Sequence, residues 1–270
     1  MPTLFRRRKY RTREEVYEAY IKPKRIFGNL YFVGIRAVCT HLIDTGAGLI
    51  IIDPGYYESL QIIIKKIEEL GFTISDIKYI VVSHAHFDHM DSVEELAFMT
   101  GAKTFIGKDD LPLLTGEAFH YNLKPFKPDV LLSDGDVISL GKTNIRCVAT
   151  PGHTEGTMSF FFDVTDGEKT YRAGMFGGAG CNTLERDFII SRNLSLDVRQ
   201  KYIDSIKKIK DETVELFLGN HLGNNQTEEK LLLLDTSEVN PFIENSQKEW
   251  EAFLDGRLLA IRRIIEKESN

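Results

Sequence analysis

The stretch Ser83-His84-Ala85-His86-Phe87-Asp88-His89 places three imidazoles and one carboxylate within a single short loop. The apolar run 79–82 before it predicts a buried strand, and Ser92-Val93-Glu94-Glu95 after it fits a capping box that opens a helix. The chain has only seven histidines, so three of them within six residues argue against a chance cluster. Imidazole and carboxylate are ligands that suit zinc. The segment therefore predicts a metal site in a strand-to-helix loop.

The spacing within this loop favours two metal ions over one. His84 and His86 are two residues apart, so in a tight loop their rings can point the same way. Asp88 and His89 then turn to another side. One loop can thus contribute ligands to two neighbouring cations.

Two further histidines stand beside glycine directly after predicted strands, at His153 in Pro151-Gly152-His153-Thr154 and at His221 in Gly219-Asn220-His221. Glycine lets the backbone approach closely and adopt unusual dihedral angles. Either histidine alone would more often be structural than a ligand. Their common position at strand ends makes both of them candidate ligands.

The pattern of apolar residues around these motifs predicts an α/β fold in one large domain. Each half of the chain has β-strands first and helices afterwards, which indicates two mixed β-sheets packed face to face with helices outside, a four-layer αβ/βα sandwich. Strands are predicted at 29–34, 37–44, 49–53, 79–82, 103–106, 137–140, 144–149, 157–163, 170–173 and 216–218. Helices are predicted at 56–70, 92–101, 196–210, 227–234 and 242–267.

The domain is expected to cover residues 24–270 and to follow a basic extension with a helix at 1–23. Residues 1–25 carry nine Lys or Arg against three Glu. No aromatic residues alternate with these charges in the manner of a nucleic-acid surface, so no nucleic-acid partner is expected. A solvated helix and a contact between copies of the chain, giving a homo-oligomer, both remain open for this arm.

Three features predict a cytoplasmic protein with no membrane association. No apolar run approaches the roughly 18 residues that span a bilayer. No apolar segment of the secretory type follows the basic start. The three cysteines, Cys39, Cys147 and Cys181, are sparse and unpaired in spacing, which suits a reducing compartment and burial as small apolar side chains.

Taken together, His84-Ala85-His86-Phe87-Asp88-His89, Pro151-Gly152-His153-Thr154 and Gly219-Asn220-His221 resemble the metallo-β-lactamase fold superfamily, over about residues 24–225. The resemblance implies two zinc ions per chain. Met175 is expected to line the second metal site, where a side chain that is not a ligand leaves the zinc more loosely held. It implies one zinc ligand set made of His84, His86 and His153. It implies a second set made of Asp88, His89 and His221.

The stretch 171–178 contains no carboxylate, whereas the lactonase, glyoxalase and ribonuclease branches carry there an Asp that bridges both metals. In this respect the chain resembles the third subclass of metallo-β-lactamases. Members of that subclass usually place serines near the positions of Met175 and Gly177 to hold the β-lactam carboxylate, and these serines are absent. The resemblance therefore supports the architecture better than the antibiotic substrate.

The implied activity is that of a zinc-dependent hydrolase of small molecules, in which a metal-bound hydroxide attacks the carbonyl of a lactam, lactone or ester. Zinc lowers the pKa of bound water to about 7, so hydroxide is available at neutral pH. Asp88 would orient this nucleophile and is the expected catalytic residue. Asp53 would position the ligand loop, or it is a buried turn carboxylate.

Substrate selection is expected to fall to loops around the metals. The segment 111–130, which holds Phe119, His120 and Tyr121, is expected to lie partly over the site. Three alternatives stay open: an iron-containing oxidoreductase on the same scaffold, an ester or thioester hydrolase that does not act on β-lactams, and a non-catalytic module stabilised by metal.

Overall fold

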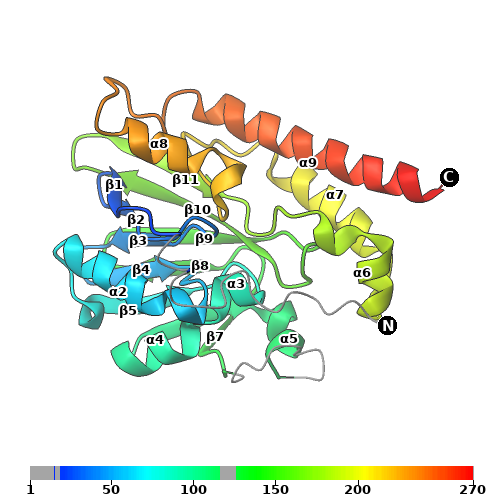
Figure 1. The fold of residues 1–270 in the computed structure, drawn as a ribbon, viewed down its shortest axis with the longest axis horizontal. Helices are drawn as coiled ribbons and strands as arrows, with labels where there is room; N and C mark the ends of the chain where they lie inside the picture. Colours follow the sequence, from blue (N-terminus) through cyan, green and yellow to red (C-terminus); the bar gives the residue numbers. More distant parts are fainter. Residues whose placement is uncertain (1–14, 16–18, 116–125, 270) are drawn as a thin grey trace.

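Two β-sheets packed face to face form the centre of the molecule, in a computed structural model that describes residues 15, 19–115 and 126–269 (Figure 1). The first sheet has seven strands in the order of the chain: β1 (Lys24–Phe27), β2 (Leu30–Phe32), β3 (His41–Asp44), β4 (Leu49–Ile52), β5 (Ile77–Val81), β6 (Lys103–Gly107) and β7 (Val130–Leu132). β1 to β4 are antiparallel, and β4 to β7 run parallel. The sheet is therefore mixed, as the sequence predicts.

The second sheet has five strands in the order β12-β11-β10-β9-β8. Their bounds are β8 (Val137–Leu140), β9 (Thr143–Ala149), β10 (Met158–Thr165), β11 (Thr170–Met175) and β12 (Leu216–Leu218). Only the β11–β12 pair is parallel among them. The two sheets are mixed in the same way, with a parallel pairing that follows antiparallel ones.

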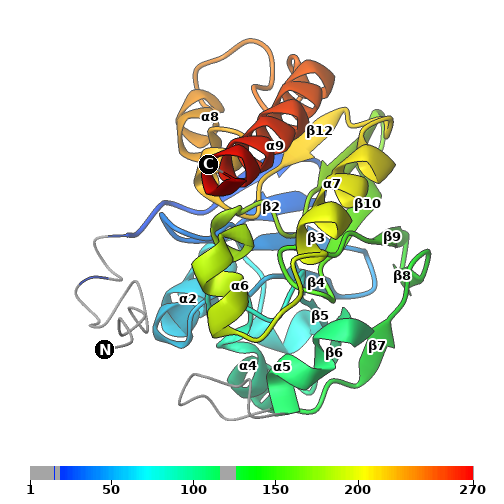
Figure 2. The ribbon, with the colours of Figure 1, turned by 90° about the vertical axis from the view of Figure 1, so that its right-hand side faces the viewer.

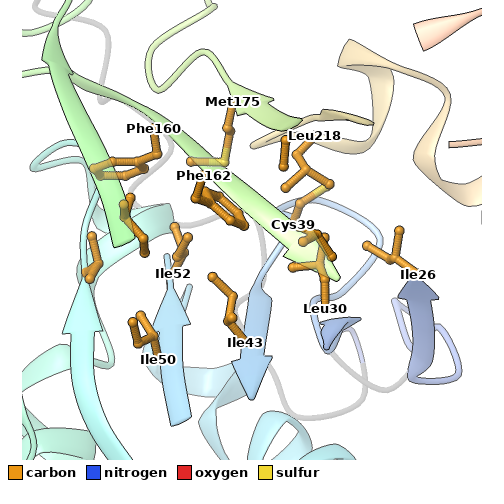
Figure 3. Close-up of a cluster of buried hydrophobic side chains, with 14 of the residues drawn as sticks. Ile26, Leu30, Cys39, Ile43, Ile50, Ile52, Phe160, Phe162, Met175 and Leu218 are labelled. Carbon is orange, nitrogen blue, oxygen red and sulfur yellow. The ribbon is translucent and has the colours of Figure 1, made fainter. Parts of the chain in front are cut away.

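Alternation along the strands separates three apolar layers. On β4, Ile50 and Ile52 face the second sheet while Leu49 and Ile51 face the outer helices, because successive side chains of a strand point to opposite faces. On β10, Phe160 and Phe162 face inward in the same manner. Figure 3 shows these inward side chains meeting between the sheets, together with Ile43, Met175 and Leu218. Burying both faces of each sheet explains the nearly continuous apolar composition of its central strands.

Helices cover the outer face of each sheet (Figure 1). The first sheet is covered by α2 (Leu60–Glu69) and α4 (Val93–Thr100), whose buried residues include Ile63, Ile67 and Leu96. The second sheet is covered by α7 (Val198–Ile209) and α9 (Ser246–Ser269), which lie side by side in Figure 2. Trp250 of α9 is fully buried, and its ring meets those of Phe161 and Phe217 edge to face. The four-layer sandwich predicted from the sequence is thus confirmed.

Several predicted boundaries differ from the observed ones. The C-terminal helix begins at Ser246 rather than at residue 242, because 241–245 form a turn that ends with Asn245 in the left-handed region. Ser92 does not form the predicted capping box: its hydroxyl donates to the carbonyls of Pro54 and Gly55 instead. The predicted strand 37–44 shortens to β3, since Val33 to Cys39 form a loop. Local patterns cannot foresee these tertiary hydrogen bonds.

Short elements escaped the sequence patterns altogether. They are β1, β7, α3 (Phe87–Met90), α5 (Leu111–Thr115), α6 (Arg186–Ser191) and the 3₁₀ turns η2 (Ile74–Asp76), η3 (Lys108–Asp110), η4 (Asn182–Leu184) and η5 (Leu222–Asn224). A further 3₁₀ turn, η1 (Tyr57–Ser59), forms the start of the predicted helix 56–70. The remaining helix, α8 (Thr227–Leu233), ends one residue before its predicted limit. Pieces of three to six residues are too short to display a period of their own.

The N-terminal arm lies mostly outside the described residues, so the helix and the contact between copies expected within 1–23 stay predictions. Where the description resumes, Ala19 and Ile21 are buried against the domain. The N–H of Arg36 donates to the carbonyl of Ala19 at 2.8 Å. Across 15, 19–115 and 126–269, no helix has both the length and the apolar character that a bilayer crossing requires.

The topology gathers one set of strand ends at one edge of the molecule. β4, β5 and β6 are parallel neighbours, so their carboxyl ends lie side by side and lead into Asp53, the histidine-rich loop and η3. β11 and β12 are also parallel, and β12 leads into His221. Loops at the carboxyl ends of parallel strands are the usual place for a ligand site in such sheets.

Candidate metal centre

The six side chains expected as ligands form two groups of three. In the first group, His84, His86 and His153 offer ring nitrogens that all lie within 4.8 Å of one another. The second group, made of Asp88, His89 and His221, meets the same criterion. Residues that are distant in sequence are thus brought together in the two sets that the resemblance implied.

In the first group, hydrogen bonds on the side of the ring away from the site fix the orientations of His153 and His84. Nδ1 of His153 lies 2.8 Å from the carbonyl oxygen of Gly180, and since that oxygen can only accept, Nδ1 carries the hydrogen. Nε2 of His153 is then unprotonated and lies 3.0 Å from Nδ1 of His86. Nδ1 of His84 donates to the hydroxyl of Ser83 at 3.0 Å, which leaves Nε2 of His84 facing the site. Partners of this kind set the tautomer of a metal-binding histidine.

In the second group, hydrogen bonds at Nδ1 fix the orientations of His221 and His89 in the same way. Nδ1 of His221 donates to the carbonyl of Ala37 at 2.9 Å, and Nδ1 of His89 donates to Oδ2 of Asp53 at 2.8 Å. The two Nε2 atoms therefore face each other, 3.2 Å apart. Oδ2 of Asp88 lies 3.6 Å from Nε2 of His89 and 3.7 Å from Nε2 of His221. In each group, three potential ligand atoms thus face one small volume.

Asp53 lies beneath both groups as a fully buried carboxylate. It accepts the backbone N–H and the hydroxyl of Ser83, each at 2.7 Å, in addition to Nδ1 of His89. Through Ser83 it reaches His84, and through His89 it reaches the second group. The backbone of Asp53 has a φ of 53°, a left-handed conformation that Asp tolerates better than most residues. Of the two interpretations of Asp53, the geometry favours the positioning one.

Burial and mutual repulsion keep most of the imidazoles neutral. Burial, followed by the neighbouring imidazoles, lowers the pKa of His84 well below its usual value and that of His86 to about 4. Burial likewise lowers the pKa of His153 and His221. For His89, burial is outweighed by Asp88 and Asp53, which raise the pKa. Neutral imidazole is the form that binds a metal ion.

Two observations indicate that these groups fit divalent cations. Nε2 of His84 is buried and has no hydrogen-bond partner within the described part of the chain, and a buried polar atom without a partner is costly. The ring nitrogens of His86 and His153 are 3.0 Å apart and those of His89 and His221 are 3.2 Å apart, so the lone pairs of each pair would face each other unless a proton or a metal ion lies beside them. Three nitrogens, or two nitrogens and a carboxylate oxygen, form a donor set that suits zinc.

Glycines let the backbone close around His153. A Cβ on Gly178 would lie 2.7 Å from Cβ of His153, and one on Gly180 would lie 3.2 Å from its ring. Gly152, with a φ of 134°, packs directly on the backbone of Tyr202. Glycine at 178 and 180 therefore lets this segment pack directly against His153, with no space for a larger side chain at either position.

Three residues near the site carried no signal in the sequence. Ser83 connects His84 to Asp53. Asp110 is buried in η3 and accepts hydrogen bonds from two ligand segments. Arg192 stands close enough to His86 to be among the charges that lower its pKa. Nothing in the local pattern distinguishes these residues from the solvated serines, aspartates and arginines around them.

The predicted cover over the site is only partly described. Within 111–130, the structure describes α5 and the segment from Phe126 into β7. Phe119, His120 and Tyr121 lie outside the described residues, so their position over the metals stays a prediction. His41, by contrast, has a structural role: Nε2 donates to the carbonyl of Gly219 at 2.9 Å and supports the His221 loop.

Residues 33–166 match the metallo-beta-lactamase superfamily. The probable polyketide biosynthesis zinc-dependent hydrolase PksB of Bacillus subtilis is 26% identical over 177 residues, which cover 64% of this chain and 68% of that protein. The hydroxyacylglutathione hydrolase of Cereibacter sphaeroides is 31% identical over 122 residues. Those residues cover 45% of this chain, which spans less than half of that relative, at 42%.

Solved structures match over nearly the whole chain. The metallo-β-lactamase FEZ-1 from Legionella gormanii superposes with a TM-score of 0.84 at 28% identity, covering 93% of this chain and 97% of its own. BJP-1, a subclass B3 metallo-β-lactamase of Bradyrhizobium japonicum, gives a TM-score of 0.84 at 26% identity, covering 96% and 98%. The likeness to the third subclass thus extends from the motifs to the full architecture.

Proposed function

Because the chain belongs to the metallo-β-lactamase superfamily and is an enzyme of that group, we propose that it is a binuclear zinc hydrolase acting on a carbonyl of a small molecule. The observation that carries the proposal is the presence of two three-residue groups, in each of which the potential ligand atoms lie within 4.8 Å of one another. A lactam, lactone, ester or thioester is the proposed substrate class. Names of relatives support both zinc dependence and hydrolysis.

Each ligand group would hold one of two zinc ions. His84, His86 and His153 would hold one ion, and Asp88, His89 and His221 would hold the other. Bound there, zinc would lower the pKa of water to provide a nucleophile at neutral pH and would polarise the scissile carbonyl. His84 and His89 are buried whereas His86, Asp88 and His153 are partly exposed, so substrate would approach from the exposed side.

Asp88 is the residue proposed to handle the proton. Burial alone would raise its pKa, but the imidazoles of His89, His221 and His86 outweigh burial and lower it. The carboxylate therefore stays ionised at neutral pH, and the oxygen that does not hold the ion can accept a hydrogen bond or a proton. Its place in the second group, near enough to His86 to be influenced by it, would let it orient a water molecule toward a bound carbonyl.

Arg192 is proposed to favour substrates that carry a carboxylate. Its guanidinium lies over the ring of Phe188, with Cζ 5.5 Å from the ring centre, and its charge acts on His86. Burial lowers the pKa of Arg192, as expected for a cation with reduced access to water. This charge would take the place of the serines that the third subclass uses.

Arg192→Ala is expected to raise KM for an anionic substrate roughly tenfold, because a charge-assisted hydrogen bond contributes about 1.5 kcal/mol. A neutral ester should be hydrolysed as before. Arg186→Ala, on the same helix but paired with Glu268, is the matched control. Steady-state kinetics on one anionic and one neutral substrate measure both effects, and an equal rise in KM for both substrates would contradict the charge-based role.

The function is tested by a substrate panel on protein whose metal content has been measured. The panel holds a chromogenic cephalosporin, a lactone, a simple ester and a glutathione thioester. We expect two equivalents of zinc and hydrolysis of at least one class, lost on chelation and restored by zinc. Zinc-loaded protein that turns over none of the four classes would contradict the proposal, and iron in protein purified without added metal would favour the oxidoreductase alternative.

A further inference from the structure

Asp110 connects the two chain segments that supply the first ligand group. Its side chain is fully buried in η3, the 3₁₀ turn that follows β6. Oδ2 accepts the backbone N–H of Ala85 at 2.7 Å and the hydroxyl of Thr154 at 2.9 Å. Oδ1 accepts the backbone N–H of Gly156 at 2.7 Å. A single carboxylate is therefore bound to both segments.

The donor residues are direct neighbours of candidate metal ligands in the chain. Ala85 is the residue between His84 and His86, and Thr154 is the residue directly after His153. Two of the hydrogen bonds reach backbone N–H groups, so Asp110 holds the path of the main chain rather than one mobile side chain. Because one carboxylate accepts hydrogen bonds from both segments, it helps to fix the distance between the His84–His86 pair and His153.

The backbones of η3 and of the His153 loop pack closely against each other. A Cβ on Gly156 would lie 2.3 Å from the backbone nitrogen of Asp110 and 2.7 Å from its Cγ. A Cβ on Gly107 would lie 1.9 Å from the carbonyl oxygen of Gly156. Glycine at both positions lets η3 lie directly against the His153 loop, and this contact aims the carboxylate at its donors.

We propose that Asp110 is a positioning residue for the first metal site, which preforms the His84–His86–His153 group by binding both of its segments. The inference rests on the proposed function for the identity of the site. Asp110 binds the segments of the first site, whereas Asp53 contacts a ligand of the second site directly, through His89. Replacing Asp110 should therefore weaken one site selectively.

Asp110→Asn should weaken the first site because it removes an acceptor for one of the three donors. In Asp110→Asn, one oxygen becomes an NH₂ group, which would face a backbone N–H or the Thr154 hydroxyl. At least one ligand segment then loses its acceptor. Loss of such supporting partners typically lowers metal affinity about 10- to 100-fold.

The test is a zinc titration against a competing chelator in two backgrounds. In His221→Ala protein the second group lacks a ligand, so the titration reports the first site. In His86→Ala protein it reports the second site. Asp110→Asn is expected to raise the first-site Kd about 10- to 100-fold and to leave the second-site Kd unchanged. Asp109→Asn is the matched control, because Asp109 is the exposed neighbour in the same turn and its replacement should change neither Kd.

Thr154→Val provides a second variant that keeps the carboxylate and removes one donor, with an expected several-fold rise in the first-site Kd. Far-UV circular dichroism of the metal-free proteins checks that each variant is folded. The inference is overturned if both Asp110→Asn and Thr154→Val leave the first-site Kd unchanged, or if both sites weaken equally. Turnover is not measured, so protein that binds zinc as expected but hydrolyses no substrate would overturn the proposed function alone.

Discussion

His86→Ala is expected to abolish hydrolysis, with kcat/KM falling by roughly 10³-fold or more. His86 contributes one of three nitrogens to the first ligand group, and its Nδ1 lies 3.0 Å from Nε2 of His153. Removing it leaves two ligands, too few to retain zinc in a site of this type. A polarising cation supplies several kcal/mol of transition-state stabilisation, and about 4 kcal/mol corresponds to roughly 10³ in rate.

Metal content provides the accompanying measurement. His86→Ala should retain one zinc equivalent, held by Asp88, His89 and His221, as measured by mass spectrometry after dialysis. His221→Ala is the matched comparison and should lose the other equivalent. A His86→Ala protein that keeps both equivalents and wild-type turnover would exclude the ligand assignment.

Asp53→Ala is expected to have the largest effect on stability, about 3–5 kcal/mol in the free energy of unfolding of metal-free protein. Three donors lose their acceptor together: the N–H and hydroxyl of Ser83 and Nδ1 of His89. Each buried donor left without a partner costs about 1–3 kcal/mol. The left-handed φ of 53° adds to the cost for alanine, since L-residues other than Asn and Asp rarely adopt it.

Urea denaturation of metal-free protein measures this effect, because bound zinc would otherwise add its own stabilisation. Asp53→Asn should cost less than Asp53→Ala, because Asn tolerates the backbone conformation and keeps one acceptor oxygen. Asp44→Asn is the control: Asp44 accepts the N–H of Gly46 at 3.0 Å near the surface and should change stability little. Equal stability of Asp53→Ala and the wild type would show that the buried network has no net effect.

The local patterns predicted the fold class because they report on burial directly. Ile50 to Ile52 and Phe160 to Phe162 are buried on both faces of their sheets, and such runs are recognisable in any sequence. The C-terminal end of α4 was equally recognisable, since Gly101 terminates the helix with a φ of 69°. Elements held by tertiary contacts alone, such as β1, β7 and η3, had no comparable signal.

The six candidate ligands could be named from the sequence because metal chemistry restricts the residue types and concentrates them in short motifs. Asp53 was foreseen only as one of two interpretations, and its role follows from the hydrogen bonds that converge on it. Asp110 was not foreseen, because an aspartate in Lys108-Asp109-Asp110 looks the same whether it is solvated or buried. Its neighbour Asp109 is in fact exposed.

The amino-acid sequence alone determined that this chain forms a two-sheet sandwich and which six side chains are its candidate metal ligands, because periodicity and ligand chemistry are properties of neighbouring residues. The tertiary structure brought those candidates together in the two groups that the resemblance implied, and it decided which ring nitrogens face the site and which buried carboxylates hold the loops in place. Those features depend on parallel strand ends that meet across long sequence separations, so no local stretch of the chain contains them.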